Sequence, residues 1–231
     1  MNRDPDTATG LTPSKLERYQ SLLKPLLIGC AAAVLAYVFA KLGSEIGEGE
    51  THFFDMQVLE LARSLRAGHP WLASVMRDLS GLGSTAVLTL FTVATVGYLA
   101  LVSARATAVL VLASVMSGSV LVSVFKAAFG RVRPDIGYAE FMVPSLSFPS
   151  GHASMSAIVF LTLGVLIAVT RRRLAERAYI LMTASLLTAL VGLSRVALGV
   201  HWATDVLGGW AFGAAWAIAW LLLARQLARR A

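Results

Sequence analysis

Long apolar stretches constrain the fold of this chain more than any other feature. Six of them, each of about 20 residues, are separated by more polar segments. A helix of about 20 apolar residues can cross a bilayer because it satisfies all its backbone N–H and C=O groups within one segment. We therefore expect an all-α fold, a six-transmembrane helix bundle. The spans are expected at roughly residues 23–42, 83–102, 106–126, 153–170, 178–198 and 203–223.

The composition agrees with a membrane protein and argues against a nucleic-acid partner. Of the 231 residues, 57% are hydrophobic and 14% are charged, whereas soluble domains carry about 25% charged residues. The net charge of +7 could indicate nucleic-acid binding, but the basic residues lie mostly in short gaps between apolar runs. Basic residues in such gaps are typical topology signals. The single cysteine, Cys30, lies within an apolar run and excludes a disulfide within the chain.

The chain is expected to hold one membrane domain, residues 22–231, preceded by a flexible cytoplasmic tail, residues 1–21. The tail is polar and contains two prolines, and no small-residue cleavage site follows the first apolar stretch. Between the first and second spans, the segment from Gly43 to Leu82 mixes aromatic and aliphatic residues with charges. This mixture predicts a short interfacial helix in the first outer loop. In the sixth span, Gly209 and Gly213 predict a close contact between helices.

The distribution of basic residues predicts the orientation. If the N-terminus is cytoplasmic, the inner segments hold 12 Lys and Arg residues and the outer segments hold 8. Cytoplasmic segments of membrane proteins carry the excess of Lys and Arg. We therefore expect both termini inside, in the inner (plasma) membrane of a bacterium.

Ionisable and small polar residues gather in three segments, and alternation of the spans brings all three to the outer side. Such residues near a bilayer are costly and indicate function. The third span ends in Lys126-Ala-Ala-Phe-Gly-Arg131-Val-Arg133-Pro134. The fourth span is preceded by Phe148-Pro149-Ser150-Gly151-His152. The fifth and sixth are joined by Ser194-Arg195-Val-Ala-Leu-Gly-Val-His201-Trp-Ala-Thr-Asp205.

These residue types suit the chemistry of a phosphoryl group. Lys126, Arg133 and Arg195 supply three cations for its oxygens. Ser150 and Gly151 precede a helix, where backbone N–H groups and the helix dipole favour an anion.

Two histidines complete this set. His201 and Asp205 are four residues apart, so on a helix the carboxylate can orient the imidazole as a nucleophile. His152 is then available for proton transfer. Arg131 could face lipid headgroups or phosphate, and Asp135 and Glu140 are expected to be solvated loop charges.

The patterns K-x6-R-P, P-S-G-H and S-R-x5-H-x3-D, in this order, resemble the type 2 phosphatidic acid phosphatases, relatives of the vanadium haloperoxidases. Every motif position is filled. The resemblance implies His201 as nucleophile, Asp205 as its orienting partner and His152 as the acid that protonates the leaving oxygen. It also implies Lys126, Arg133, Ser150, Gly151 and Arg195 as the phosphate site.

The expected activity is hydrolysis of a lipid phosphate or diphosphate through a phosphohistidine, with neither metal nor other cofactor. The substrate class covers phosphatidate, phosphatidylglycerol phosphate and polyprenyl diphosphates such as undecaprenyl diphosphate, and the sequence does not choose among them. Transfer of phosphate from a lipid diphosphate to another acceptor is a second possibility, and a lipid-binding or transport protein is a third. A soluble haloperoxidase is disfavoured by the six spans. The oligomeric state is left open.

Overall fold

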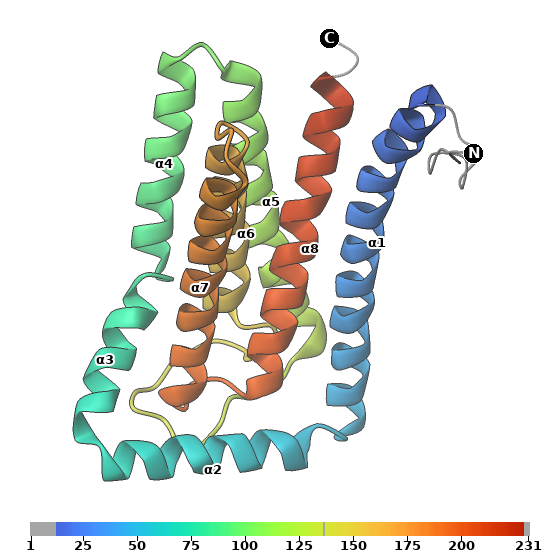
Figure 1. Ribbon diagram of the computed structural model, residues 1–231. Helices are drawn as coiled ribbons and strands as arrows, with labels where there is room; N and C mark the ends of the chain where they lie inside the picture. The colour runs from blue at the N-terminus through green and yellow to red at the C-terminus, as the bar shows by residue number, and fades with distance from the viewer. Residues whose placement is uncertain (1–12, 136, 229–231) are drawn as a thin grey trace, which may run out of the picture.

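The computed structural model of this protein describes residues 13–135 and 137–228, which form eight α-helices. Six helical segments are long and apolar enough to cross a membrane, as expected. The protein is therefore a multi-pass membrane protein, and Figure 1 shows these segments side by side in one bundle. The helices are α1 (Pro13–Glu48), α2 (His52–Gly68), α3 (Pro70–Gly81), α4 (Thr85–Leu101), α5 (Arg105–Phe129), α6 (Gly151–Ala168), α7 (Leu174–Ala197) and α8 (Ala203–Ala228).

The first helix and the second span both begin earlier in the chain than the sequence predicted. The first helix begins at Pro13, inside the segment assigned to the tail, and the rest of that predicted tail, residues 1–12, lies outside the described residues. The second span was expected at 83–102, but the apolar helical segment covers Pro70–Leu101 and is divided into α3 and α4. The division lies at Ser84, whose hydroxyl accepts a hydrogen bond of 3.3 Å from the N–H of Val87 and so caps α4.

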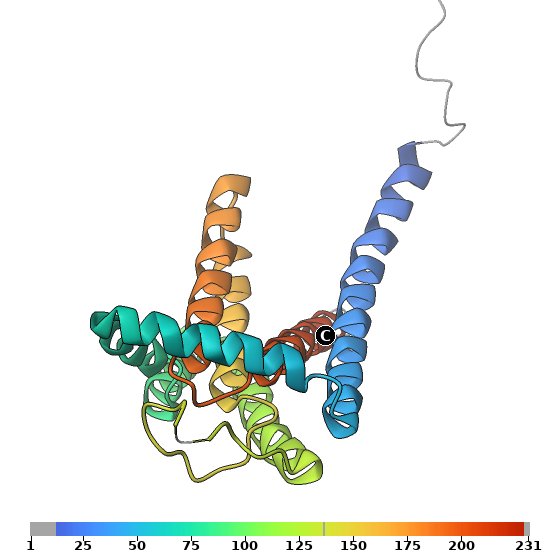
Figure 2. The ribbon, with the colours of Figure 1, turned by 90° about the horizontal axis from the view of Figure 1, so that it is seen from below.

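The predicted interfacial helix is α2, which crosses one end of the bundle from α1 to α3 (Figures 1 and 2). Leu59 and Ala62 are buried against the bundle, whereas Phe53 and Leu61 are largely exposed. A helix with one apolar face on the protein and further apolar side chains outside it suits the membrane–water boundary.

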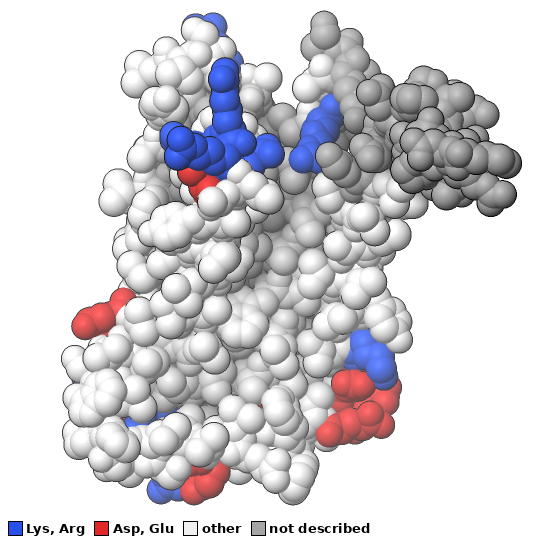
Figure 3. Space-filling view, viewed as in Figure 1, with Lys and Arg blue, Asp and Glu red and all other residues white. Residues whose placement is uncertain are grey.

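Charged side chains mark the two ends of the bundle. On the face shown in Figure 3, a broad uncharged band separates the charges at one end from those at the other. The ribbon places the beginning of α1 and the end of α8 at the same end, opposite α2 (Figure 1). This arrangement is the one that an even number of spans requires.

Two glycines allow α8 to lie unusually close to α6, as the sequence predicted. A Cβ atom on Gly213 would lie 2.5 Å from the carbonyl oxygen of Ser154 and 2.6 Å from Cβ of Ala157. A Cβ atom on Gly209 would lie 2.9 Å from the carbonyl oxygen of Ser150. Real Cβ contacts are longer, so only glycine permits this approach. The close packing brings the first turns of α6 and α8 together.

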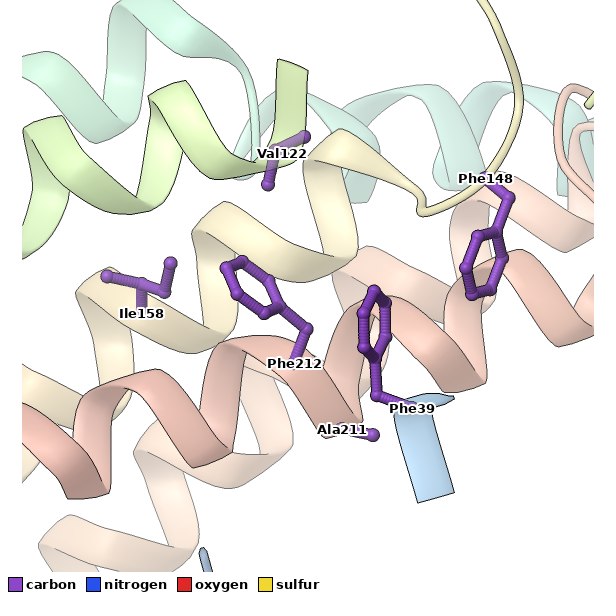
Figure 4. Close-up of a cluster of buried hydrophobic side chains, with 6 residues drawn as sticks. All are labelled: Phe39, Val122, Phe148, Ile158, Ala211 and Phe212. Carbon is purple, nitrogen blue, oxygen red and sulfur yellow. The ribbon is translucent and has the colours of Figure 1, made fainter. Parts of the chain in front are cut away.

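An aromatic cluster supports the same region from the side of α1. Phe148, immediately before Pro149, is fully buried and stacks on Phe39 of α1, with ring centroids 5.5 Å apart. Figure 4 shows Phe148 and Phe212 on either side of Phe39, and Phe39 and Phe212 are 5.6 Å apart. Burying large rings contributes strongly to packing. The turn that leads into α6 is therefore anchored in the core of the bundle.

Candidate active site

The three polar segments meet at the end of the bundle that α2 covers. The backbone N–H of Ser150 donates to the carbonyl oxygen of Asp205 at 3.0 Å. The N–H of Ser147 donates to the carbonyl oxygen of Arg131 at 2.8 Å. The first bond joins segments separated by α6 and α7, and the second joins the two ends of the loop between α5 and α6. The convergence expected from alternation of the spans is therefore present.

His201 and Asp205 form a buried pair at the start of α8. The Nδ1 atom of His201 lies 3.2 Å from Oδ2 of Asp205, and both residues are buried. On its other side, Nε2 of His201 lies 2.9 Å from Nη1 of Arg133. A guanidinium can only donate, so Nε2 accepts and the ring proton belongs on Nδ1, facing the carboxylate. This tautomer leaves Nε2 unprotonated, which a nucleophilic nitrogen requires.

Ser147 also supports this pair, although no motif in the sequence marks it. Its hydroxyl donates to Oδ2 of Asp205 and lies 3.4 Å from Nδ1 of His201. The N–H of Trp202 donates to the same carboxylate oxygen at 2.9 Å. Several donors on one carboxylate fix its position and balance its buried charge.

Two of the three predicted cations lie beside this pair. Nε of Arg133 donates to the carbonyl oxygen of Ser145 at 2.6 Å, and its Nη1 donates to the carbonyl oxygen of Val200 at 2.5 Å. Lys126 donates to the carbonyl oxygen of Leu146 and lies 3.3 Å from that of Ser147. Both cations are thus held by backbone oxygens rather than by carboxylates.

The Lys126 side chain lies close to the start of α6. A Cβ atom on Gly151 would be 3.9 Å from Cε of Lys126. Ser150 caps this helix, because its hydroxyl accepts from the N–H of Ala153 at 3.5 Å. His152 follows in the first turn, with its ring next to Gly83. Lys126 and His152 therefore both lie at the start of α6.

Arg195, the third predicted cation, is only 4% exposed. Its Nη1 donates to the hydroxyl of Ser80 in α3 at 2.5 Å, and its guanidinium lies 5.7 Å from the centre of the Phe141 ring. Within the described residues its Nε has no hydrogen-bond partner. A buried guanidinium with an unused donor is suited to an anionic ligand.

Burial lowers the pKa values of His201 and Arg133, two ionisable site residues that lie in loops. Burial lowers the pKa of His201 to about 3; the Asp205 carboxylate opposes this shift, and the charges of Arg133 and Lys126 add to it. The imidazole is therefore neutral at physiological pH. Burial also lowers the pKa of Arg133, against the opposing charge of Asp205, but a guanidinium stays protonated.

Arg131, for which the sequence allows a headgroup contact or a phosphate contact, pairs with two carboxylates in the structure. Its guanidinium lies between the carboxylates of Asp55 and Asp205, at 2.6 Å and 2.8 Å. Asp55 comes from α2 and is fully buried. The sequence carries no local signal for this contact, because the two acids are separated by 150 positions and by four spans.

Glu140 also differs from its expected role as a solvated loop charge. Its carboxylate lies 3.2 Å from Nη1 of Arg77 and 3.7 Å from Nε of Arg66. Arg66 in turn donates to the carbonyl oxygens of Ala197 and Tyr138. This cluster ties the loop before α6 to α2, α3 and α7.

Among the residues that the structure describes, no three His, Cys, Asp or Glu side chains are grouped as a metal site.

Comparison with known proteins identifies the family of this chain. A family model described as the PAP2 superfamily matches residues 107–229. Phosphatidylglycerophosphatase B of Bacillus subtilis is 33% identical over 146 residues, which are 62% of this chain and 71% of that protein. The lipid A 1-phosphatase of Rhizobium johnstonii is 33% identical over 110 residues, which are 44% of this chain and 41% of that protein.

Solved structures share the arrangement of helices. The crystal structure of a transmembrane PAP2-type phosphatidylglycerolphosphate phosphatase from Bacillus subtilis superposes with a TM-score of 0.78 at 27% identity. The match covers 85% of this chain and 96% of the other. Aquifex aeolicus LpxE matches with a TM-score of 0.54 at 22% identity, over 72% of this chain and 93% of the other. The second likeness supports the fold alone.

Proposed function

Since this chain belongs to the PAP2 superfamily and is a membrane lipid phosphatase, we propose that it works through a phosphohistidine on His201 and acts on phosphatidylglycerol phosphate. The observation that carries the first part is the environment of His201. Its Nδ1 faces Asp205 at 3.2 Å and its Nε2 faces Arg133 at 2.9 Å. One nitrogen is thus oriented by a carboxylate, and the other is directed to the cations.

The proposed reaction has two steps. In the first, Nε2 of His201 forms a bond to phosphorus while the bond from phosphorus to the lipid oxygen breaks, and His152 gives that oxygen a proton. In the second, water attacks the phosphohistidine, His152 accepts the proton, and the N–P bond breaks to release inorganic phosphate. Phosphoryl transfer depends mainly on positioning and on stabilising charge.

The phosphate oxygens are assigned to Lys126, Arg133 and Arg195 and to the start of α6 at Ser150 and Gly151. The unused Nε of Arg195 supports this assignment, as does the position of the Lys126 side chain close to the start of α6. Arg133 exchanges its contact with His201 for the phosphate when substrate binds. These three cations supply the charge stabilisation that a divalent metal supplies in many phosphoryl-transfer enzymes, so we propose a metal-independent reaction.

The proposed substrate rests on relatives rather than on the site. The phosphatidylglycerophosphatase relative and the phosphatidylglycerolphosphate phosphatase structure each match over most of their own length. The lipid A 1-phosphatase relative matches over 41% of its length and is the weaker guide.

The orientation is proposed from the basic residues and the position of the site. The site lies at the α2 end, opposite the first turn of α1 and the last turn of α8 (Figure 1). With the termini cytoplasmic, the site faces the periplasm or the exterior of a bacterial inner membrane, where it meets lipids of the outer leaflet.

Phosphate release by the detergent-purified protein tests the function. The panel holds phosphatidylglycerol phosphate, phosphatidate, a polyprenyl diphosphate and lipid A 1-phosphate, each with excess chelator. We expect release in chelator, fastest from phosphatidylglycerol phosphate, and none from a His201→Ala variant. Loss of activity in chelator would remove the metal-independent mechanism, and a faster rate on another lipid would replace the substrate. Lipid products that carry the phosphate on an added alcohol would instead indicate a phosphotransferase.

A further inference from the structure

Asp55 and Arg131 form a buried ion pair that lies outside the phosphate site. Nη2 of Arg131 is 2.6 Å from Oδ2 of Asp55, and its Nη1 is 2.8 Å from Oδ1 of Asp205. Both carboxylates are fully buried, and the arginine side chain is 12% exposed. The planar fork of an arginine can hold two carboxylates at once in fixed geometry. The arginine therefore links α2 to the first turn of α8.

Asp55 makes a second connection to the same turn. Its Oδ1 accepts from the N–H of Thr204 at 3.0 Å, and its Oδ2 accepts from the Thr204 hydroxyl at 2.7 Å. The Thr204 hydroxyl also accepts from Nη1 of Arg131 at 2.7 Å. A carboxylate that binds the first N–H groups of a helix stabilises that end of the helix. Here the stabilised end of α8 carries Asp205. The Trp202 ring covers the Arg131 guanidinium, whose central carbon lies 5.3 Å from the ring centroid.

The charges in this cluster leave one negative charge next to His201. Two carboxylates, of Asp55 and Asp205, face the single guanidinium of Arg131. With Asp55 absent, Arg131 would pair with Asp205 alone and neutralise it. Transfer of phosphate to Nε2 makes the His201 ring cationic, and that cation is stabilised by a carboxylate that keeps its charge. Asp55 thus preserves the negative charge of Asp205, which stabilises the cationic ring of His201.

We propose that Asp55 and Arg131 are positioning residues for phosphoryl transfer, which hold Asp205 in place and keep its charge available to His201. The proposal rests on the proposed role of His201 as the nucleophile. It separates Arg131 from Lys126, Arg133 and Arg195, which are held by neutral groups and assigned to phosphate. It also makes α2 part of the catalytic apparatus, because this helix supplies the acid that caps α8.

The test compares turnover with phosphate binding in full-length detergent-purified protein. The variants are Asp55→Asn and the double variant Asp55→Asn/Arg131→Gln, with Glu140→Gln as the matched control. Glu140 is a loop acid that pairs with Arg77 and Arg66 and does not contact His201 or Asp205. Breaking one half of a buried ion pair can unfold a protein. The double variant removes Asp55 and Arg131 together, and Asp205 keeps its contacts with Ser147, His201 and Trp202. The double variant therefore tests the proposal even when Asp55→Asn does not fold.

For both Asp55 variants we expect kcat and the single-turnover rate of phosphoenzyme formation to fall by up to about 100-fold, as a misplaced reacting group does. The inhibition constant of inorganic phosphate should stay within about twofold, because the phosphate ligands are unchanged. Glu140→Gln should match the unmodified protein in both quantities. Unchanged kcat in the folded double variant, or equal losses in turnover and phosphate binding, would overturn the proposal. If unmodified protein is inactive or His201→Ala keeps its activity, the proposed function itself fails.

Discussion

The backbone N–H of Ser150 donates a 3.0 Å hydrogen bond to the backbone carbonyl of Asp205. This contact joins the turn before α6 to the first turn of α8. The relative position of His152 and His201 is therefore set by the main chain and by the close packing of two helices.

Replacing Gly213 by alanine tests the packing of α6 against α8. The added Cβ would lie 2.5 Å from the Ser154 carbonyl oxygen, so the helices must separate. Overpacking of this kind costs about 1–3 kcal/mol. We expect a lower thermal midpoint in detergent and reduced activity. The control is Gly97→Ala in α4, where no atom lies within 4 Å and alanine is the better helix former. Equal thermal midpoints for Gly213→Ala and Gly97→Ala would contradict the close packing of α6 against α8.

Replacing Arg195 by lysine tests whether the planar guanidinium of this buried residue is needed. Lysine keeps the charge but cannot hold Ser80 through one nitrogen and present a second donor to phosphate. We expect kcat/KM to fall by about 10-fold to 100-fold, on the order of 1.4 kcal/mol for each factor of ten, with the protein still monodisperse. Ser80→Ala should show a smaller loss, since it removes only the support. Unchanged kcat/KM in Arg195→Lys would mean that this residue does not contact the transferred group.

The pH dependence follows from the buried His201. Because burial lowers its pKa to about 3, the ring is neutral and reactive at neutral and mildly acidic pH and is lost as a nucleophile only near pH 3. The acid limb of kcat/KM reports the nucleophile of the free enzyme. After correction for ionisation of an aryl phosphate substrate, we expect no acid limb near the ordinary histidine value of about 6.5. A remaining limb at that value would contradict a buried, neutral His201.

Single cysteines test which side of the membrane the site faces, in a Cys30→Ala background. Met142, in the loop before α6, and Leu174, at the start of α7, are both 80% exposed and lie at opposite ends of the bundle. In intact cells an impermeant thiol reagent should label Met142→Cys and leave Leu174→Cys unlabelled. After permeabilisation both should react. Labelling of Leu174→Cys alone in intact cells would reverse the proposed orientation.

The sequence predicted the spans well because apolar length is a local property. It also predicted the helix contact at Gly209 and Gly213, which depends only on spacing along one helix. It missed α3, whose charges Arg77 and Asp78 interrupt the apolar pattern. Within the site it selected residues that lie in short motifs, and it missed those that act from a distance.

Asp55, Ser80 and Ser147 belong to this second group. Asp55 and Ser80 lie on α2 and α3, and each contacts an arginine more than 70 positions away, Arg131 and Arg195 respectively. Ser147 lies close to a motif in the sequence, but its partner Asp205 is 58 positions away. Such partners are fixed by the packing of the bundle, and a single sequence carries no local pattern that reveals them.

The direct test of the proposed chemistry is to trap the phosphorylated residue in His201→Ala and His152→Ala with two substrates. One substrate is an activated aryl phosphate, whose leaving group needs no proton, and the other is a lipid phosphate monoester, whose leaving group does. General acid catalysis contributes about 10²–10⁴-fold, so His152→Ala should still form a phosphoenzyme with the aryl phosphate while failing on the lipid. His201→Ala should form none with either. Rapid acid-free digestion and mass spectrometry should place the phosphate on His201, as a bond that is stable in base and labile in acid. Phosphate found on His152, or a phosphoenzyme that survives in His201→Ala, would contradict the assignment of His201 as the nucleophile.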